Sequence, residues 1–218
     1  MTNVWDERAE AYRDSPGHRE GEDLDLVVEW CEPDAGVKVL DVATGGGHVA
    51  RRLRERGCEV VTADPSPGMR PDVLCGAEDL PFADGSFDVV VSRIAPHHFQ
   101  DIRRAVAELA RVSNRLVVIE DTLYSSEAHE EAERLRDPTH VRNYTEEEWR
   151  DFLADSGLEP ELLEFVEKRH PLESWLERTG CKGSEADRVR ALLADRMTDD
   201  GQVWVDTKIL FRARKSQT

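Results

Sequence analysis

Residues 37–48 read Val37-Lys38-Val39-Leu40-Asp41-Val42-Ala43-Thr44-Gly45-Gly46-Gly47-His48. The β-branched run at the start predicts a short buried strand, and three consecutive glycines follow it. Val49, Ala50 and Leu53 then recur at helical spacing, and Gly57 is placed to end that helix in a left-handed conformation. A strand, a glycine turn and a helix in this order predict the opening unit of a Rossmann-type fold. Glycine is needed at the turn because side chains would keep a ligand from the backbone and the helix N-terminus.

An acidic residue ends the next predicted strand, residues 59–63. Asp64 lies 21 residues after Ala43, close to the spacing of about 20 at which such folds place an acid to bind ribose hydroxyls. An incidental acid beside a structural glycine turn is the alternative interpretation. The turn and the acid together favour a site for an adenosine-containing cofactor.

The spacing of the small residues distinguishes two kinds of cofactor site. A dinucleotide site has the pattern G-x-G-x-x-G, whereas this chain has Ala43-x-Gly45-x-Gly47 directly after Asp41. With this motif the chain resembles the class I S-adenosylmethionine-dependent methyltransferases, in the branch related to ubiquinone and menaquinone C-methyltransferases. The resemblance continues through residues 76–82, 84–90, 97–99 and 137–142, and it covers most of the chain.

The resemblance implies S-adenosylmethionine as the cofactor. It implies that Asp64 binds the ribose hydroxyls and that the Ala77-Glu78 segment lies along the adenine. It also implies that the Gly45 region and Arg93 lie near the amino-acid end, which Asp41 contacts through water. The full set of implied cofactor-binding residues is Asp41, Ala43, Thr44, Gly45, Gly47, Asp64, Pro65, Ala77, Glu78 and Arg93.

Two histidines are the candidates for catalysis. A methyl sulfonium is intrinsically reactive, so the protein need only hold the acceptor in line and, for some acceptors, remove a proton. His97 and His98 follow the fourth predicted strand, where the resemblance places the acceptor, and histidine is the side chain best able to take a proton near neutral pH. Which of them is a base stays open, as does a positioning or packing role. No metal site is predicted, because no ligand spacing repeats elsewhere.

A basic cluster follows the fifth predicted strand: Arg134, Arg136, His140 and Arg142. We expect this cluster to bind a polar or anionic acceptor or to clamp a lid, with His140 and Arg142 as the candidate substrate-binding residues. Salt bridges to the glutamate-rich segments at 127–133 and 146–148 are the alternative.

Strand and helix patterns alternate along the chain, which predicts an α/β fold with a parallel sheet and helices on both faces. Strands are expected at residues 37–42, 59–63, 72–75, 87–92, 115–119, 161–167 and 203–211. Helices are expected at 170–180 and 184–197, and Thr145 with Glu148 predicts a capping box. Together with the resemblance, this gives a Rossmann-like, doubly wound, mostly parallel seven-stranded sheet with an antiparallel last strand.

We expect one domain over residues 1–218. Its parts would be a helical cap at 1–34, a cofactor-binding core at 37–120, and lid or acceptor-side insertions at 121–144 and 168–200.

The composition limits the possible partners. The formal net charge of −17 repels phosphate backbones and anionic membrane surfaces, so we expect no nucleic-acid partner and no membrane insertion. The four cysteines lack C-x-x-C spacing and fit a cytoplasmic protein. The acid-rich, lysine-poor composition fits a halophilic source or a high-GC genome equally. We expect a small-molecule acceptor and a monomer or homodimer.

Two other functions use a similar sequence pattern. One is an NAD(P)-dependent oxidoreductase, although the chain has no Tyr-x-x-x-Lys pair. The other is a non-catalytic S-adenosylmethionine-binding protein on the same fold, because a fold does not determine a chemistry.

Overall fold

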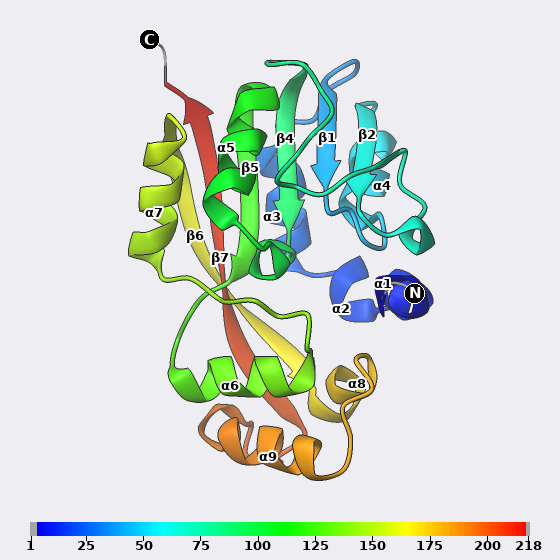
Figure 1. Cartoon of the computed structure of the whole chain (residues 1–218), viewed down its shortest axis with the longest axis vertical. Coiled ribbons are helices and arrows are strands. Elements are labelled where there is room, and N and C mark those ends of the chain that lie inside the picture. Colours follow the sequence, from blue (N-terminus) through cyan, green and yellow to red (C-terminus); the bar gives the residue numbers. More distant parts are fainter. Residues whose placement is uncertain (1–3, 217–218) are drawn as a thin grey trace.

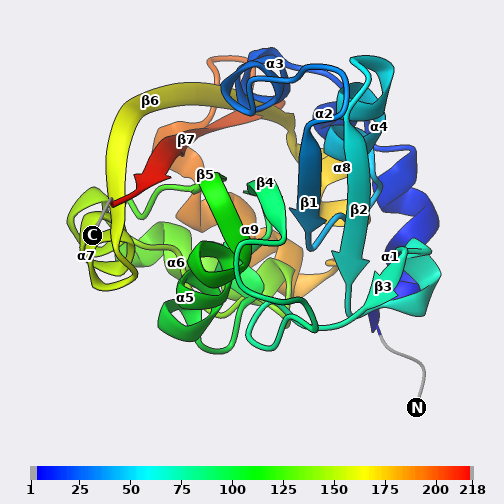
Figure 2. The ribbon, with the colours of Figure 1, turned by 90° about the horizontal axis from the view of Figure 1, so that it is seen from above.

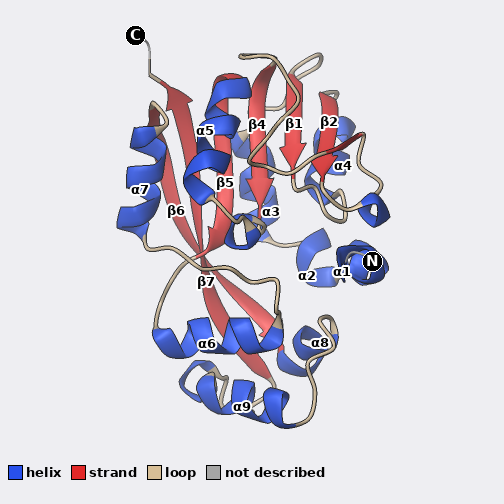
Figure 3. Ribbon diagram, viewed as in Figure 1, coloured by secondary structure: helices blue, strands red, loops and turns tan. Residues whose placement is uncertain are grey.

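The computed structural model describes residues 4–216, and the strands in this range form one seven-stranded sheet (Figures 1 and 3). The strands are β1 (Lys38–Val42), β2 (Glu59–Asp64), β3 (Val73–Leu74), β4 (Phe87–Arg93), β5 (Ser113–Thr122), β6 (Leu158–Pro171) and β7 (Val203–Lys215). Their order is β3-β2-β1-β4-β5-β7-β6. The first five strands pair in parallel, and β7 pairs antiparallel with both β5 and β6. The predicted α/β, mostly parallel sheet with an antiparallel last strand is confirmed.

The two faces of the sheet bury separate apolar layers, because successive side chains of a strand point to opposite faces. In β4, Val90 belongs to one layer, while Val89 and Val91 belong to the other. In β5, Val117 and Val118 divide between the two layers in the same way. Strands buried on both faces read as continuous apolar runs, which is why β4 and β5 show no polar alternation in the sequence.

Helices cover both apolar layers (Figure 2). On one face, α3 (Glu22–Trp30) and α4 (His48–Glu55) contribute buried residues to the layer that contains Val89. On the other, α5 (Ile102–Val112) and α7 (Glu146–Asp155) pack against the layer that contains Val90. The remaining helices of the described chain are α1 (Val4–Arg13), α2 (Pro16–Arg19), α6 (Glu127–Arg136), α8 (Leu172–Glu177) and α9 (Ser184–Leu192), with short 3₁₀ turns η1 (Pro67–Met69), η2 (Pro96–His98) and η3 (Ala194–Arg196).

β6 and β7 extend beyond the other strands as a two-stranded ribbon (Figure 1). At the far end of this ribbon, α6, α8 and α9 pack in a third apolar cluster that includes Trp175 and Trp204. This helical layer lies beyond the carboxyl ends of the parallel strands (Figure 1), which is where α/β sheets bind ligands.

The ribbon changes several boundaries from those predicted. β6 covers 158–171 instead of 161–167, because its ladder with β7 continues from Leu158 to Pro171 beyond the apolar segment. The helix expected at 170–180 is shortened to α8 at 172–177, because residues 170 and 171 belong to the strand. The helix expected at 184–197 ends at Leu192, and η3 follows it. Cross-strand pairing, which depends on a distant segment, decides these boundaries.

Two local signals of the sequence act as predicted. Gly57 has φ 89° directly after α4, so it takes the left-handed conformation that ends the helix. Thr145 and Glu148 form the reciprocal capping box at the start of α7.

Candidate active site

A cavity of about 320 Å³ lies at the carboxyl ends of β1, β2 and β4, and we call it the cofactor cavity. Its lining includes ten of the residues predicted from the sequence: Asp41, Ala43, Thr44, Gly45, Asp64, Pro65, Ala77, Glu78, Arg93 and His98. Gly47 and His97 lie outside this lining. The strand topology therefore brings together nearly all residues of the glycine turn, the acid after β2 and the loop after β4.

The glycine turn holds its shape through left-handed backbone conformations. Gly45 has φ 51° and Gly47 has φ 73°, and Gly47 is the N-cap of α4. Gly46 was not predicted as a site residue, but the structure leaves no space for a side chain at this position. A Cβ there would lie 2.6 Å from His48 Nε2 and 3.0 Å from the Tyr12 carbonyl oxygen. The middle glycine of the run is therefore required because α1 packs directly on the turn.

Asp41 fixes the turn from inside the fold. Its Oδ2 accepts hydrogen bonds from Thr44 Oγ1 at 2.6 Å and from the Ala50 amide at 3.2 Å. Burial is the largest influence on its carboxyl group and raises the pKa of Asp41 to about 6, against the effect of these two hydrogen bonds. The turn is thus anchored by a carboxylate that is costly to ionise.

Asp64 connects the glycine turn to the loop after β2. Its Oδ2 accepts from the Gly45 amide at 3.0 Å, and its Oδ1 accepts from the Ser66 amide at 2.9 Å. Burial raises the pKa of Asp64, and these amides oppose that shift. Asp64 lines the cavity, and each carboxylate oxygen keeps further capacity to accept a hydrogen bond, which is the chemistry needed to bind hydroxyl groups.

Arg93 lies in a buried network of four charges. Its guanidinium pairs with Asp23 and with Glu120 (Nε–Oε2 2.7 Å) and donates to the His18 carbonyl oxygen at 3.1 Å. Lys168 completes the network by pairing with Asp23. Burial raises the pKa of Glu120 to about 7, although the Arg93 charge acts in the opposite direction. Arg93 therefore lines the cavity with its charge already balanced by residues of α3 and β5, which sequence motifs did not reveal.

The first helix, α1, forms part of the cavity wall. Trp5 and Tyr12 of α1 line the cavity. The helix is fastened by Asp6, whose Oδ1 accepts from Ser66 Oγ at 2.6 Å and from the Gly68 amide at 2.7 Å. These contacts hold α1 in place as one wall of the cofactor cavity.

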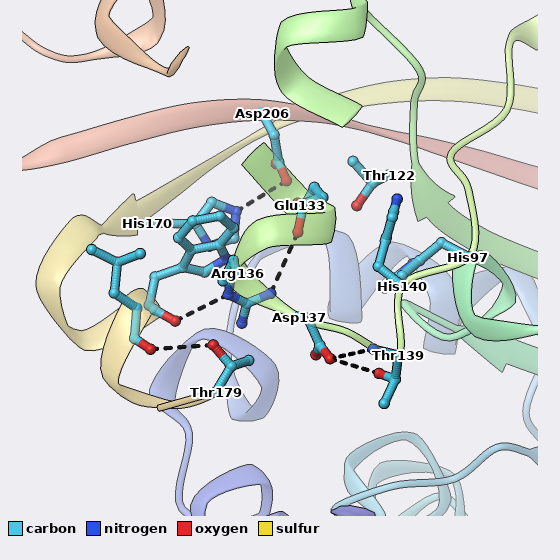
Figure 4. Close-up of polar contacts among 12 residues, drawn as sticks. His97, Thr122, Glu133, Arg136, Asp137, Thr139, His140, His170, Thr179 and Asp206 are labelled. Carbon is cyan, nitrogen blue, oxygen red and sulfur yellow. Dashed lines mark hydrogen bonds and ion pairs between the residues drawn. The ribbon is translucent and has the colours of Figure 1, made fainter. Parts of the chain in front are cut away.

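A smaller chamber of about 40 Å³ adjoins the cofactor cavity, and we call it the polar chamber. Four residues line both spaces: Tyr12, His18, Ile94 and His98. The rest of the polar chamber includes Gly17, His97, Thr122, Glu133, Arg136, Lys168, His170, Trp175, Arg178, Asp206 and Lys208. Figure 4 shows part of this wall, with Arg136 and His170 on one side and His97 on the other.

The two candidate histidines face different partners. His97 Nδ1 lies 2.5 Å from Asp121 Oδ1, and although burial opposes the charged form, this carboxylate raises the pKa of His97. His98 Nδ1 lies 3.0 Å from the Thr139 carbonyl oxygen. Because a carbonyl only accepts, Nδ1 of His98 carries the proton and Nε2 keeps a lone pair. Burial and then the His97 charge lower the pKa of His98 well below its usual range.

The predicted acceptor-side residues lie near the polar chamber but outside its lining. His140 is buried and pairs with Glu130 (Nε2–Oε2 3.3 Å), and Arg142 is exposed and pairs with Glu148 at 2.7 Å. The backbone amides of Val141 and Arg142 donate to the His97 carbonyl oxygen at 2.9 and 3.2 Å. Their segment therefore supports the histidine loop, while Arg136 is the member of the basic cluster that lines the chamber.

Arg178 lines the polar chamber, and the sequence analysis did not predict it as a site residue. It is the C-cap of α8, and no motif surrounds it. Only the position of α8 at the end of the ribbon brings it to the polar chamber.

The described residues show neither a metal-binding cluster nor a membrane-spanning helix. Within residues 4–216, no group of three or more histidine, cysteine, aspartate or glutamate side chains is arranged to hold a metal ion. Among the helices of the described chain, none combines the length and apolar character needed to cross a membrane.

Comparison with known proteins identifies methyltransferases as relatives of this chain. Residues 40–115 match the family model described as a methyltransferase domain. The uncharacterized methyltransferase YcgJ of Bacillus subtilis is 32% identical over 218 residues, with 88% of this chain and 85% of that protein covered. The crystal structure of the YcgJ protein superposes with a TM-score of 0.79 at 26% identity, covering 89% of this chain and 98% of that chain.

Two further relatives have a stated activity or ligand. A demethylmenaquinone methyltransferase of Thermus thermophilus is 38% identical over 116 residues, which is 44% of this chain and 51% of that protein. The structure of Haemonchus contortus phosphoethanolamine N-methyltransferase 2 in complex with S-adenosyl-L-methionine has a TM-score of 0.65 at 19% identity, with 97% of this chain and 57% of that chain covered. The second of these likenesses shows the shared fold.

Proposed function

Because the chain belongs to the class I S-adenosylmethionine-dependent methyltransferases, we propose that it transfers the methyl group to a small-molecule acceptor that reaches the cofactor cavity from the polar chamber. The observation that carries this proposal is the position of His98. Its ring lines both spaces and keeps a lone pair on Nε2, so a proton acceptor stands where donor and acceptor would meet.

The cofactor cavity has the chemistry that S-adenosylmethionine requires. Asp64 would accept from the ribose hydroxyls with its second lone pairs. Ala77 and Glu78 would lie along the adenine, and Glu78 is held in place because its Oε1 accepts from the Gln100 amide at 2.8 Å. The Gly45 backbone would approach the amino-acid end of the cofactor, where the absence of a side chain leaves room.

The remaining implied residues support this arrangement. Ala43, Thr44 and Pro65 would form the wall around the ribose and the amino-acid end, and Gly47 acts from outside the lining by starting α4. Arg93 would shape the wall of the cavity more than it would bind the cofactor carboxylate, since protein carboxylates already pair with its guanidinium.

Proton removal is assigned to His98. When bound, the cofactor supplies an electrophilic methyl group, which the acceptor nucleophile takes as the sulfur–methyl bond breaks. His98 Nε2 would take the proton that the acceptor loses. The Thr139 carbonyl keeps the ring in the tautomer that can do so. His97 would act as a positioning residue, because Asp121 holds its ring. The His97 charge also adds to the effect of burial in lowering the pKa of His98.

His140 and Arg142 are proposed to act through the backbone of their segment. Two amides of this segment hold the His97 carbonyl oxygen, so the segment fixes the histidine loop. Direct contact with the acceptor is not needed for this role.

Binding and turnover separate the proposal from its alternatives. Calorimetric titration with S-adenosylmethionine, S-adenosylhomocysteine and NAD(P)H should show saturable binding of the first two and none of the third. Incubation with methyl-labelled S-adenosylmethionine and a metabolite extract should then yield a labelled small molecule. Binding without any labelled product would instead favour a non-catalytic cofactor-binding protein.

A further inference from the structure

In the described part of the chain, some of the cationic side chains that line the polar chamber form ion pairs with carboxylates and Arg178 does not. Lys208 pairs with Asp206 at 2.7 Å, and Lys168 pairs with Asp23. Arg178 lines the same chamber, but its guanidinium has no ion pair and no side-chain hydrogen bond with any residue between 4 and 216. This arginine therefore brings a charge into a partly enclosed space with no carboxylate among the described residues in direct contact, although the Glu133 charge of the same lining acts on it from a distance.

Arg136 is a second cation in the lining of the polar chamber, and its ion pair with a carboxylate is long. It is buried, its Nε donates to the Trp175 carbonyl oxygen at 3.1 Å, and its guanidinium stacks 4.1 Å from the Trp175 ring centroid. Its contact with Glu133, between Nη1 and Oε2, is 3.5 Å long (Figure 4). The packing fixes the orientation of Arg136, while the long ion pair leaves part of its charge available to a ligand.

The two arginines repel each other inside the fold. Burial, followed by the Arg136 charge, lowers the pKa of Arg178 to about 10, so Arg178 stays charged at neutral pH but at an energetic cost. Burial and then the Arg178 charge also lower the pKa of His18 well below its usual range, so this ring adds no further charge. An anion in the chamber would relieve this repulsion.

Size and donor chemistry narrow the kind of anion. A chamber of about 40 Å³ has room for an oxyanion group or a few waters. Tyr12 lines it with a phenol, and burial raises the pKa of Tyr12, so its hydroxyl stays a neutral donor. Guanidinium groups and a phenol hydroxyl match the acceptor oxygens of a carboxylate or a phosphate.

We propose that the polar chamber is an oxyanion-binding subsite, in which Arg178 and Arg136 hold a carboxylate or phosphate group of the methyl acceptor. The acceptors of this enzyme are then small acids whose nucleophilic atom lies toward His98. This assignment rests on the proposed methyltransferase function, since the chamber adjoins the cofactor cavity and shares four lining residues with it. Arg136, at the end of α6, belongs to the basic cluster noted in the sequence, whereas Arg178, at the end of α8, does not.

The test compares an acid with its neutral isostere on protein saturated with S-adenosylhomocysteine. Calorimetry at low ionic strength measures propionate, propionamide and inorganic phosphate as probes. Propionate or phosphate should bind at least about tenfold more tightly than propionamide, because a charge-assisted pair is lost with the amide. The tighter of the two anions identifies the head group.

Variants locate the binding. R178Q should weaken binding of the preferred anion by about tenfold or more, and R178K should recover part of that lost affinity. R178Q should keep the affinity for S-adenosylhomocysteine, because Arg178 lies outside the cofactor cavity. R188Q is the matched control, since Arg188 is an exposed arginine of α9 paired with Glu131 at 3.0 Å, and it should bind the anion as the unchanged protein does.

Three outcomes overturn the subsite. They are equal binding of acid and amide, no saturable binding of either anion, and anion binding that R178Q leaves intact. A protein that fails to bind S-adenosylhomocysteine contradicts the proposed function instead, so the two failures are distinguishable.

Discussion

His98 donates its Nδ1 proton to the carbonyl oxygen of Thr139 at a distance of 3.0 Å. This contact joins the loop after β4 to the segment after α6, which are 41 residues apart in the chain. It selects the tautomer of His98 and directs the unprotonated Nε2 away from Thr139. The neighbouring His97 is held by Asp121, so the adjacent imidazoles have different protonation tendencies.

Removal of the proposed base should affect turnover selectively. H98A should lower kcat by ~10²–10⁴-fold with an acceptor that must lose a proton, while cofactor affinity changes little. H98N is the informative partner, because its amide can still donate to Thr139 but offers no basic nitrogen. If H98N restores kcat, His98 positions the loop and is not a base.

The charge on His97 should set the pH range of activity. H97Q removes a neighbouring charge that lowers the pKa of His98, so the acidic limb of the kcat profile should move to higher pH. The profile of the unchanged protein, measured over the same buffers, is the reference. An acidic limb that stays in place would show that the two rings titrate independently.

Asp64 should contribute to cofactor affinity through its charge. D64A should weaken S-adenosylmethionine binding by ~1–3 kcal/mol in calorimetry, because it removes charge-assisted hydrogen bonds to the ribose. D64A also removes the acceptor for the Gly45 amide, so D64N serves to separate charge from turn geometry. D79A changes an exposed carboxylate beside the site and should have little effect. Wild-type affinity in both Asp64 variants would exclude ribose recognition by this residue.

The middle glycine of the turn, Gly46, should tolerate no side chain. G46A places a Cβ 2.6 Å from His48 Nε2 and 3.0 Å from the Tyr12 carbonyl oxygen. We expect a loss of ~1–3 kcal/mol in unfolding free energy from overpacking, together with weaker cofactor binding as α1 is displaced. G17A is the stability control, since nothing lies within 4 Å of an added Cβ there. Equal stability of G46A and the unchanged protein would show that α1 does not pack on the turn.

Buried Asp41 should make stability depend on pH in a defined window. Its folded-state pKa of about 6 exceeds an unfolded value of about 4, so the stabilising difference is complete below pH ~4 and is lost as pH rises through ~6. The loss amounts to ~3 kcal/mol of unfolding free energy. Denaturant titrations of the apoprotein and of D41N at pH 4 to 7 measure it. A parallel decline in both proteins would contradict the assignment to Asp41.

The sequence by itself determined the fold class and the cofactor side of the site. A β-branched strand, consecutive glycines, an acid at a fixed interval and alternating elements are local or short-range signals. Parallel topology then forces the strand ends to meet at one edge. This is why Asp41, Gly45, Asp64 and Arg93, chosen from the chain alone, line one cavity.

Tertiary structure alone decided the acceptor side. Arg178, Lys168 and Glu120 lie in segments without motifs, and they reach the site only because the β6–β7 ribbon and the buried network place them there. The same distant contacts moved the ends of β6 and α8 and separated Arg136 from Arg142. Contacts between side chains that are tens of residues apart depend on packing in three dimensions. The periodicity of the sequence therefore cannot predict them.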